Sequence, residues 1–190
     1  MLTTVFVPVA VQAHERGQAS TSLRQLSQIQ AAVQLYAADA NNHVPYAVGN
    51  TCYHQAVDRN QGCDAVPALF IRELVPLNAV LATYQVPTEA YRSPVDHMER
   101  YFPQSAGYKP TWFEESTTAR YPGSSFEYTT RYGLLSRSLS SFGASSATIL
   151  IASMFSIGDG AAAKRQIAFA DGHAQTLPIR EVGDLLMRQD

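Results

Sequence analysis

Residues 13–40 read AHERGQASTSLRQLSQIQAAVQLYAADA, with apolar side chains at intervals of three and four. This spacing places the apolar side chains on one face of an α-helix, with Arg24 and the glutamines opposite. Asn41, Asn42 and Pro45 then end the helical pattern. The sequence therefore predicts a long helix that packs one face on the rest of the chain. That face carries Leu23, Leu26, Ile29, Val33, Tyr36 and Ala40.

The preceding residues 1–12 read MLTTVFVPVAVQ and extend the helix with apolar sequence. They are too few to cross a bilayer, which takes about 20 residues, and they lack the basic start of a secretory signal. Pro8 removes one backbone hydrogen bond from a helix there. The whole helix would be roughly 55 Å long at 1.5 Å per residue, more than one small domain can cover. We therefore expect residues 1–22 to project as an apolar half-helix and residues 23–190 to form a globular head.

The composition fits a globular protein with an unusually uncharged surface. Hydrophobic residues make up 46% of the 190 residues, while charged residues make up only 16% and the net charge is −2. The usual charged share is about 25%. This balance disfavours a basic nucleic-acid binder, so no nucleic acid partner is expected. A low charge suits a subunit whose faces pack on neighbours.

The second half of the chain predicts a small antiparallel sheet. Asp171 and Gly172 separate two strand-like segments and form a strong hairpin signal, which we assign to a type I′ turn with both residues at positive φ. Residues 67–82 are a second, shorter apolar stretch, in which residues 68–75 predict a short helix ended by Pro76. The fold class is therefore α+β: a long N-terminal helix packed on a small antiparallel sheet, with loop-rich insertions. The expected strands are 126–132, 148–154, 166–170 and 174–177, followed by a terminal helix at 181–188.

Cys52 and Cys63 lie in a polar segment with ten residues between them. A disulfide clamping this loop is the favoured interpretation, and it would contribute about 2–3 kcal/mol on chain-entropy grounds. Two free thiols are the first alternative. A zinc site is the second, with His54 as the only further ligand nearby. A disulfide would indicate an oxidising compartment.

Sequence motifs for catalysis or metal binding are absent, and four weak candidates remain. A metal hydrolase site would have to assemble Asp96, His97, Asp171 and His173 in space. A calcium site would use Asp159 and Asp171, although calcium prefers about six oxygen ligands. The run Gly158-Asp159-Gly160 resembles a phosphate loop only loosely. The aromatic stretch 98–128, which contains Trp112, would supply a carbohydrate-binding face, with ordinary packing as the simpler interpretation.

Several short motifs occur one after another along the chain. They are VPVA at 7–10, AHER at 13–16, LRQL at 23–26, LYAAD at 35–39, VP at 44–45, RSPVD at 92–96, YG at 132–133, ATILIA at 147–152 and AFADGH at 168–173. In this order the chain resembles the type IV pilin-like and type II secretion pseudopilin superfamily, in particular the bacterial group with a C-terminal H-x9-D-G motif. The resemblance extends over nearly the whole chain.

The resemblance implies a structural protein and no enzyme. It would be a subunit of an extracellular type IV pilus-like filament or of a periplasmic secretion pseudopilus, anchored in the inner membrane before assembly. Its partners would be further copies of itself and the assembly machinery. The helix-to-sheet core would be Leu23, Leu26, Ile29, Val33 and Tyr36. The assembly interface, or membrane-facing patch, would be Val5, Phe6, Val7, Pro8, Val9 and Val11.

The chain departs from that family in three ways. A prepilin leader and about half of the usual membrane helix are missing before Val5. The motif histidine falls on Ala161, so its role does not carry over. Ser93 stands where the family often has cysteine, and Thr21 stands near another such position, which makes Cys52–Cys63 a local substitute. The alternative function is a secreted or surface adhesive module, such as a minor tip subunit, that binds glycans through residues 98–128.

Overall fold

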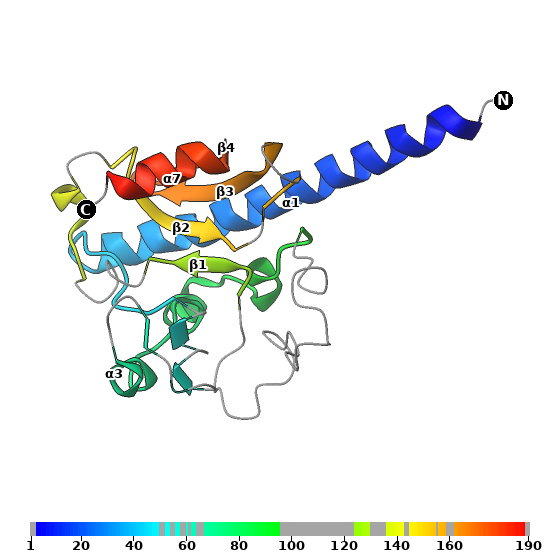
Figure 1. The fold of residues 1–190 in the computed structure, drawn as a ribbon. Helices are drawn as coiled ribbons and strands as arrows, with labels where there is room; N and C mark the ends of the chain where they lie inside the picture. The colour runs from blue at the N-terminus through cyan, green and yellow to red at the C-terminus, as the bar shows by residue number, and fades with distance from the viewer. Residues whose placement is uncertain are drawn as a thin grey trace.

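The computed structural model describes most of the chain. The described residues are 3–49, 52–53, 56–57, 60, 62–63, 67–95, 124–129, 136–142, 145–154, 156–158 and 162–188, with side chains from residue 11 onward. Within these residues a long N-terminal helix packs on a four-stranded antiparallel sheet (Figure 1). The expected α+β architecture is confirmed.

Helix α1 runs unbroken from Thr3–Asp39, through both Pro8 and Gly17. Its end is set by Asn41 and Asn42, whose φ angles are 52° and 65°. The Asn42 N–H donates to the carbonyl oxygen of Ala37 at 2.7 Å, the six-residue closure of a Schellman motif. Asparagine tolerates this left-handed conformation better than most residues, which explains why the helix stops where the sequence predicts.

The sheet has the strand order β1-β2-β3-β4, and each neighbouring pair is antiparallel. The strands are β1 Phe126–Tyr128, β2 Ile149–Ser153, β3 Lys164–Phe169 and β4 Ala174–Pro178. All four begin or end within a few residues of the predicted strands. The predicted residues 130–132 lie outside the described part of the chain.

Two helices cover opposite faces of this sheet (Figure 1). Helix α1 contributes Leu26, Ile29 and Val33 to the main core, where they pack against β1, β2 and β3. Helix α7, Ile179–Met187, places Val182 and Leu185 against the outer face. A register shift between Ile149 and Ile151 turns Ile149 toward α7 and leaves Leu150 and Ile151 in the main core. The result is a helix–sheet–helix sandwich.

The segment between α1 and β1 contains short helices. They are α3 Ala68–Arg72, α4 Leu77–Val80, η1 Leu81–Tyr84 and η2 Thr88–Tyr91, and η4 Leu139–Ser141 follows β1. The prediction of one helix ended by Pro76 is wrong, because α3 already ends at Arg72 and Pro76 instead precedes α4. Val48 donates to the carbonyl oxygen of Val75 and accepts from the Leu77 N–H, at 3.1 Å each, so the chain stays extended at Pro76.

The β3–β4 hairpin is where the sequence predicts it, but its turn type is different. Ala168 pairs with Ala174, and the Phe169 N–H donates to the carbonyl oxygen of His173, which leaves three loop residues. Only Gly172 has positive φ, at 99°. The predicted type I′ turn is therefore wrong. A three-residue loop of this kind is a type I turn followed by a left-handed residue, which requires a single glycine.

Gly49 is required by a close approach of two segments. A Cβ atom at this position would overlap the Glu127 carboxylate and lie 2.7 Å from the carbonyl oxygen of Tyr128. We expect Gly49→Ala to lower the free energy of unfolding by about 1–3 kcal/mol, because β1 must shift to relieve the overlap. Gly183→Ala is the control, since nothing lies within 4 Å of that position in α7. It is expected to stabilise by up to about 1 kcal/mol. Equal effects of the two in urea unfolding would contradict this account.

Two core tyrosines predict a loss of stability at alkaline pH. Burial raises the pKa of Tyr91 and of Tyr128 above the ordinary 10.0, and the nearby Tyr36 adds to the shift at Tyr128. Above pH 10 both ionise in the unfolded chain while staying protonated in the fold. The unfolding free energy should then fall by about 1.4 kcal/mol per pH unit for each.

This slope can be measured by urea unfolding at a series of pH values above 10. Tyr91→Phe should remove one tyrosine's share of the slope at little cost near neutral pH, because its buried hydroxyl has no hydrogen-bond partner among the described residues. An unchanged slope in Tyr91→Phe would contradict the assignment.

Candidate assembly surface

The N-terminal half of α1 extends beyond the sheet and away from the head (Figure 1). All described side chains from residue 11 to residue 17 are exposed, and Val11 is 51% exposed. Gln18 and Ala19 are half-buried, and Ser22 is the first described side chain that is fully buried. We call residues 11–17 the free segment.

The side chains of most of the predicted assembly interface lie outside the described part of the structure. Val5, Phe6, Val7, Pro8 and Val9 belong to the helical backbone of α1, and only Val11 has a described side chain. The predicted interface therefore remains a prediction from the sequence. Its one described member is exposed.

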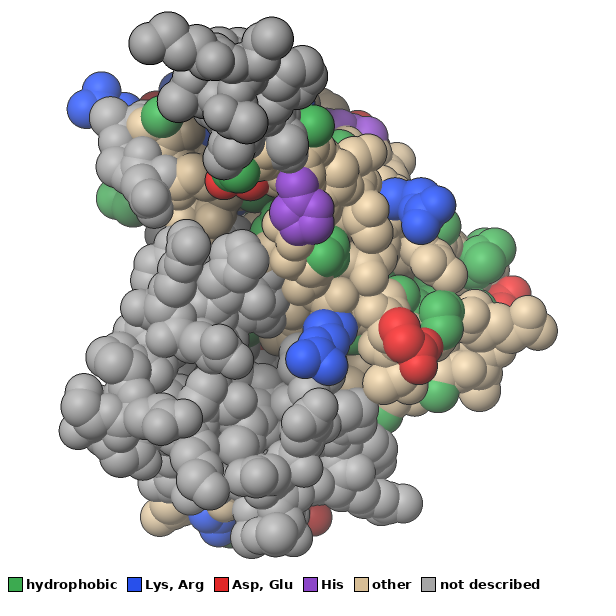
Figure 2. All heavy atoms as spheres, turned by 90° about the vertical axis from the view of Figure 1, so that its right-hand side faces the viewer, with side chains coloured by type: hydrophobic (Ala, Val, Ile, Leu, Met, Phe, Trp, Pro, Cys, Tyr) green, Lys and Arg blue, Asp and Glu red, His purple; other side chains and the backbone are tan. Residues whose placement is uncertain are grey.

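The free segment carries little charge. Glu15 and Arg16 are adjacent and opposite in sign, and His14 precedes them. On the described part of the face seen from the N-terminal side, charged side chains are scattered among uncharged ones (Figure 2). A nearly neutral exposed helix of this kind can pack on another copy of itself without bringing like charges together.

A buried polar cluster holds α1 where it reaches the head. The Ser22 hydroxyl donates to Gln166 Oε1 at 2.5 Å and lies 2.6 Å from the Ser93 hydroxyl, which must then be the donor of that pair. Gln166 Nε2 donates to the carbonyl oxygen of Ala19 at 2.6 Å. Ser22, Ser93 and Gln166 are at most 3% exposed. We call this cluster, with the Ala19 carbonyl, the Gln166 clamp.

Two further serine hydroxyls, one in β2 and one just before β1, accept hydrogen bonds from the backbone of clamp residues. The backbone N–H of Gln166 donates to the Ser153 hydroxyl at 3.1 Å, and the N–H of Ser93 donates to the Ser125 hydroxyl at 2.9 Å. The clamp thus connects α1 to β2, to β3 and to the two segments that contain Ser93 and Ser125. Hydrogen bonds in a dry interface fix one register, because any shift would leave buried polar groups unpaired.

Three glutamines of α1 bind backbone carbonyls of the head. Gln30 Nε2 donates to Phe169 O at 2.7 Å, and Gln34 Nε2 donates to Ala170 O at 3.1 Å, so both hold the β3–β4 hairpin. Gln25 Nε2 donates to the carbonyl oxygens of Glu89 and Arg92, at 3.0 and 3.1 Å. The helix is therefore positioned by directional bonds as well as by apolar packing.

The structure brings together most of the predicted helix-to-sheet core. Leu26, Ile29 and Val33 are 0% exposed, and Tyr36 packs against the same cluster while half-buried. The Tyr84 hydroxyl donates to the Asp39 carboxylate at 3.1 Å. Partial burial raises the pKa of Tyr84 most, and the Asp39 carboxylate raises it further. Leu23 is half-buried, one turn before Leu26.

The sequence reasoning missed Ser22, Gln30 and Gln166. A signal for the first two was present, because they fall at helical spacing on the same stripe as Leu26 and Val33. Polar residues inside an otherwise apolar stripe indicate buried hydrogen bonds. For Gln166, 144 residues away from Ser22, no local signal exists.

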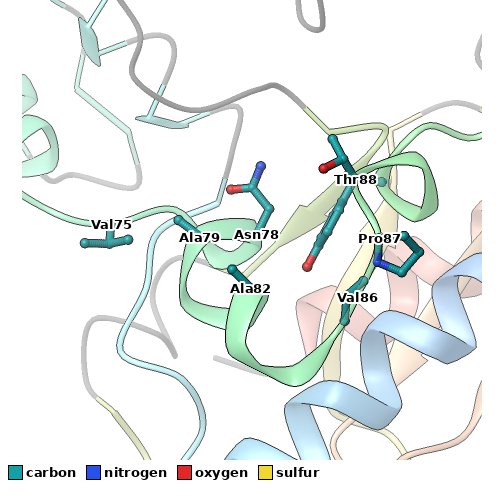
Figure 3. Close-up of a pocket in the computed structure, with 8 residues that line it drawn as sticks. Val75, Asn78, Ala79, Ala82, Val86, Pro87 and Thr88 are labelled. Atoms are coloured by element: carbon teal, nitrogen blue, oxygen red, sulfur yellow. The ribbon is translucent and has the colours of Figure 1, made fainter.

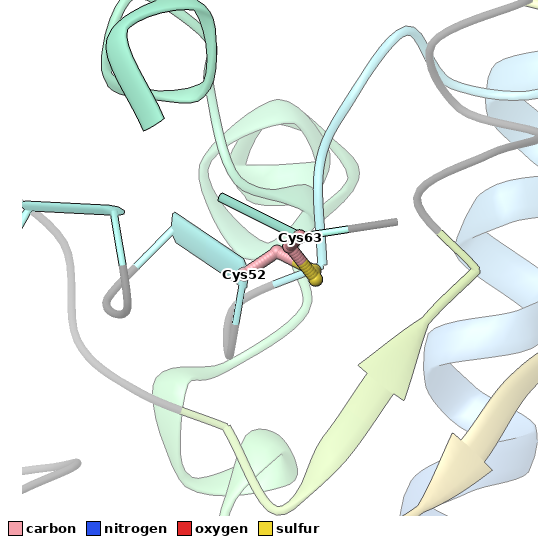
Figure 4. The surroundings of a disulfide bond; sticks show 2 residues. All are labelled: Cys52 and Cys63. Carbon is pink, nitrogen blue, oxygen red and sulfur yellow. A yellow bond between two sulfur atoms is a disulfide. The ribbon is translucent and has the colours of Figure 1, made fainter. Parts of the chain in front are cut away.

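Cys52 and Cys63 form a disulfide, with their Cα atoms 5.4 Å apart (Figure 4). The prediction of a disulfide is confirmed, and the thiol and zinc alternatives no longer apply. The bond lines a groove of about 400 Å³ on the outer side of the sheet, together with Glu127, Tyr128 and Thr129. A separate small core lies nearby. Its buried members are Val48, Tyr53, Ala56, Ala68 and Ile71.

The hairpin residues Asp171 and His173 contact each other. Asp171 Oδ1 accepts a hydrogen bond from the His173 N–H at 3.2 Å and contacts His173 Nδ1 at 2.5 Å. The His173 ring stacks on Phe169 with centroids 4.2 Å apart. The predicted metal partners Asp96, His97 and Asp159 lie outside the described residues. Within the described ranges, no three His, Cys, Asp or Glu side chains gather as a metal site would require.

A cavity of about 520 Å³ lies between α4 and the residues leading into η2 (Figure 3). Asn78, Ala79 and Ala82 approach from one side, and Val86, Pro87 and Thr88 from the other. Among the described residues that line it, Tyr91 is the only ionisable one, and its hydroxyl is buried. Of the aromatic stretch 98–128, Phe126 and Tyr128 belong to the core, whereas Trp112 lies outside the described residues.

Comparison with family models, with curated proteins and with solved structures finds no match for this chain. Among the helices in the described residues, none is both long enough and apolar enough to cross a membrane.

Proposed function

We propose that this protein is a structural subunit that assembles by packing the N-terminal halves of its α1 helices against one another. One observation carries the proposal: the described side chains from residue 11 to residue 17 are exposed on a helix that continues into a firmly held core. A helix gains most of its stability from packing, so an exposed helical arm calls for a partner surface.

The sequence supports a second copy as that partner. Residues 5–11 are VFVPVAV, and the adjacent Glu15 and Arg16 leave the exposed part electrically balanced. The resemblance to type IV pilins and pseudopilins then names the assembly: an extracellular pilus-like filament or a periplasmic pseudopilus. The subunit would be held in the inner membrane and handled by an assembly machinery before it polymerises. The disulfide supports an oxidising compartment.

Cysteine crosslinking in the source cells tests this function. Ala13→Cys places a thiol on the free segment, and Gly183→Cys places one on exposed α7, across the sheet from α1. We expect oxidation to crosslink copies through residue 13 and not through residue 183. Both variants remaining monomeric would overturn the proposal.

A surface binding module, adhesive or glycan-binding, stays the alternative function. Its predicted face, residues 98–128, falls largely outside the described residues, and the two described aromatic residues within it are buried. Glycan binding by the full chain that is lost in Trp112→Ala would favour it.

A further inference from the structure

The Gln166 clamp lies at the point where the environment of α1 changes. N-terminal to it, residues 11–17 are exposed; C-terminal to it, Leu26, Ile29 and Val33 are completely buried. Counting from residue 11, Ala19 is the first residue of α1 with a hydrogen bond to the head: its carbonyl oxygen accepts from Gln166 Nε2. The C-terminal part of α1 is thus stabilised by packing and hydrogen bonds to the head, whereas residues 11–17 have no such support within the described residues.

The free segment is a poor helix former by itself. It contains Gly17, which favours the helix less than alanine does, and Ser20 and Thr21 follow shortly after it with the same weakness. A Cβ atom at Gly17 would meet nothing within 4 Å, so no packing offsets the glycine. Helix ends without tertiary contacts open with free energies near zero. Nothing in the free segment itself opposes fraying from the N-terminus toward the head.

The clamp gives that fraying a defined end. Gln166 holds the Ala19 carbonyl, and Ser22 one turn later is bonded to both Gln166 and Ser93. Opening the helix past Ala19 would break these buried bonds and leave their polar groups unpaired. Each such group costs about 1–3 kcal/mol. Local opening should therefore stop at the clamp.

We propose that, outside a membrane, the part of α1 before Ala19 becomes stably helical only when it packs against α1 of a second copy, and that the Gln166 clamp sets the boundary of this coupled folding. The inference rests on the proposed function for the identity of the partner. Ordering the segment costs conformational entropy when two copies meet. Two free copies then associate weakly, while a growing end that already presents ordered helices adds a subunit more easily.

Hydrogen exchange of the full chain, read by mass spectrometry of overlapping peptides, tests the boundary. In the dispersed chain, amides of residues 11–17 should exchange within about tenfold of an unstructured peptide, while those of residues 26–37 stay protected. In the assembled chain at high concentration, the amides before Ala19 should become protected at least a hundredfold more than in the dispersed chain.

Two variants locate the clamp's contribution. Gln166→Leu should move the boundary of protection toward the C-terminus by about one helical turn, because Ala19 and Ser22 lose their partner. Gln28→Leu, the same change on the exposed face of α1, should leave the boundary in place. Gly17→Ala should raise protection of the free segment about fivefold without changing residues 26–37.

The outcomes separate this inference from the proposed function. Equal protection of residues 11–17 and 26–37 in the dispersed chain overturns the inference even if the chain assembles. An unprotected free segment in a chain that never self-associates overturns the proposed function and, with it, the coupling to a second copy. If Gln166→Leu and Gln28→Leu shift the boundary of protection equally, the Gln166 clamp does not set that boundary.

Discussion

Leu26→Ala is expected to lower the free energy of unfolding by about 3 kcal/mol. Leu26 is 0% exposed and lies in the main core between α1 and the sheet. The substitution removes three carbon atoms from a site enclosed by α1 and the strands, so the lost burial and the remaining cavity both contribute. For a chain of this size the melting temperature should fall by about 6–12 °C.

Leu35→Ala provides the matched control. It is the same substitution on the same helix, but Leu35 is 57% exposed. We expect its effect to stay within about 0.5 kcal/mol. Thermal and urea unfolding of the two dispersed variants would measure the difference. Similar effects would contradict the assignment of the buried face of α1.

Loss of the disulfide is expected to cost about 3 kcal/mol, either in Cys52→Ala/Cys63→Ala or after reduction. The cross-link joins residues 11 positions apart and therefore restricts the unfolded chain. In the fold it lies close to a small core of five buried residues, which has little apolar surface of its own to hold that loop. This region should loosen before the main core does.

The disulfide prediction is measured by urea unfolding with and without a reductant. The parent chain should become less stable in the reductant, and the double alanine variant should respond to it hardly at all. A parent chain whose unfolding is unaffected by complete reduction would contradict the role given to the bond.

Much of the fold follows from local sequence patterns. The stripe from Leu26 to Tyr36 specifies the buried face of α1, and the paired asparagines after it specify its end. The position of the β3–β4 hairpin follows from Asp171 and Gly172 for the same reason: the information lies within a few residues. These features depend on local backbone preferences and periodicity, which a sequence displays directly.

Features that depend on distant partners could not be predicted in this way. The turn type of the hairpin depends on the pairing of Ala168 with Ala174, and α3 ends early because residues 75–77 pair with Val48. The Gln166 clamp joins Ser22 to Gln166, which lies 144 residues later in the chain. Only the tertiary structure reveals that Ser22 and Gln30, polar members of an apolar stripe, are bonded to specific groups of the head.

The central claim is that this chain builds a filament through the exposed half of α1. Negative-stain electron microscopy of material shed by the source cells, combined with intact-mass analysis of the chain within it, tests this most directly. We predict filaments that contain the chain. A chain recovered only as a soluble monomer, with a mass that starts at Met1, would contradict the claim and favour a surface binding module.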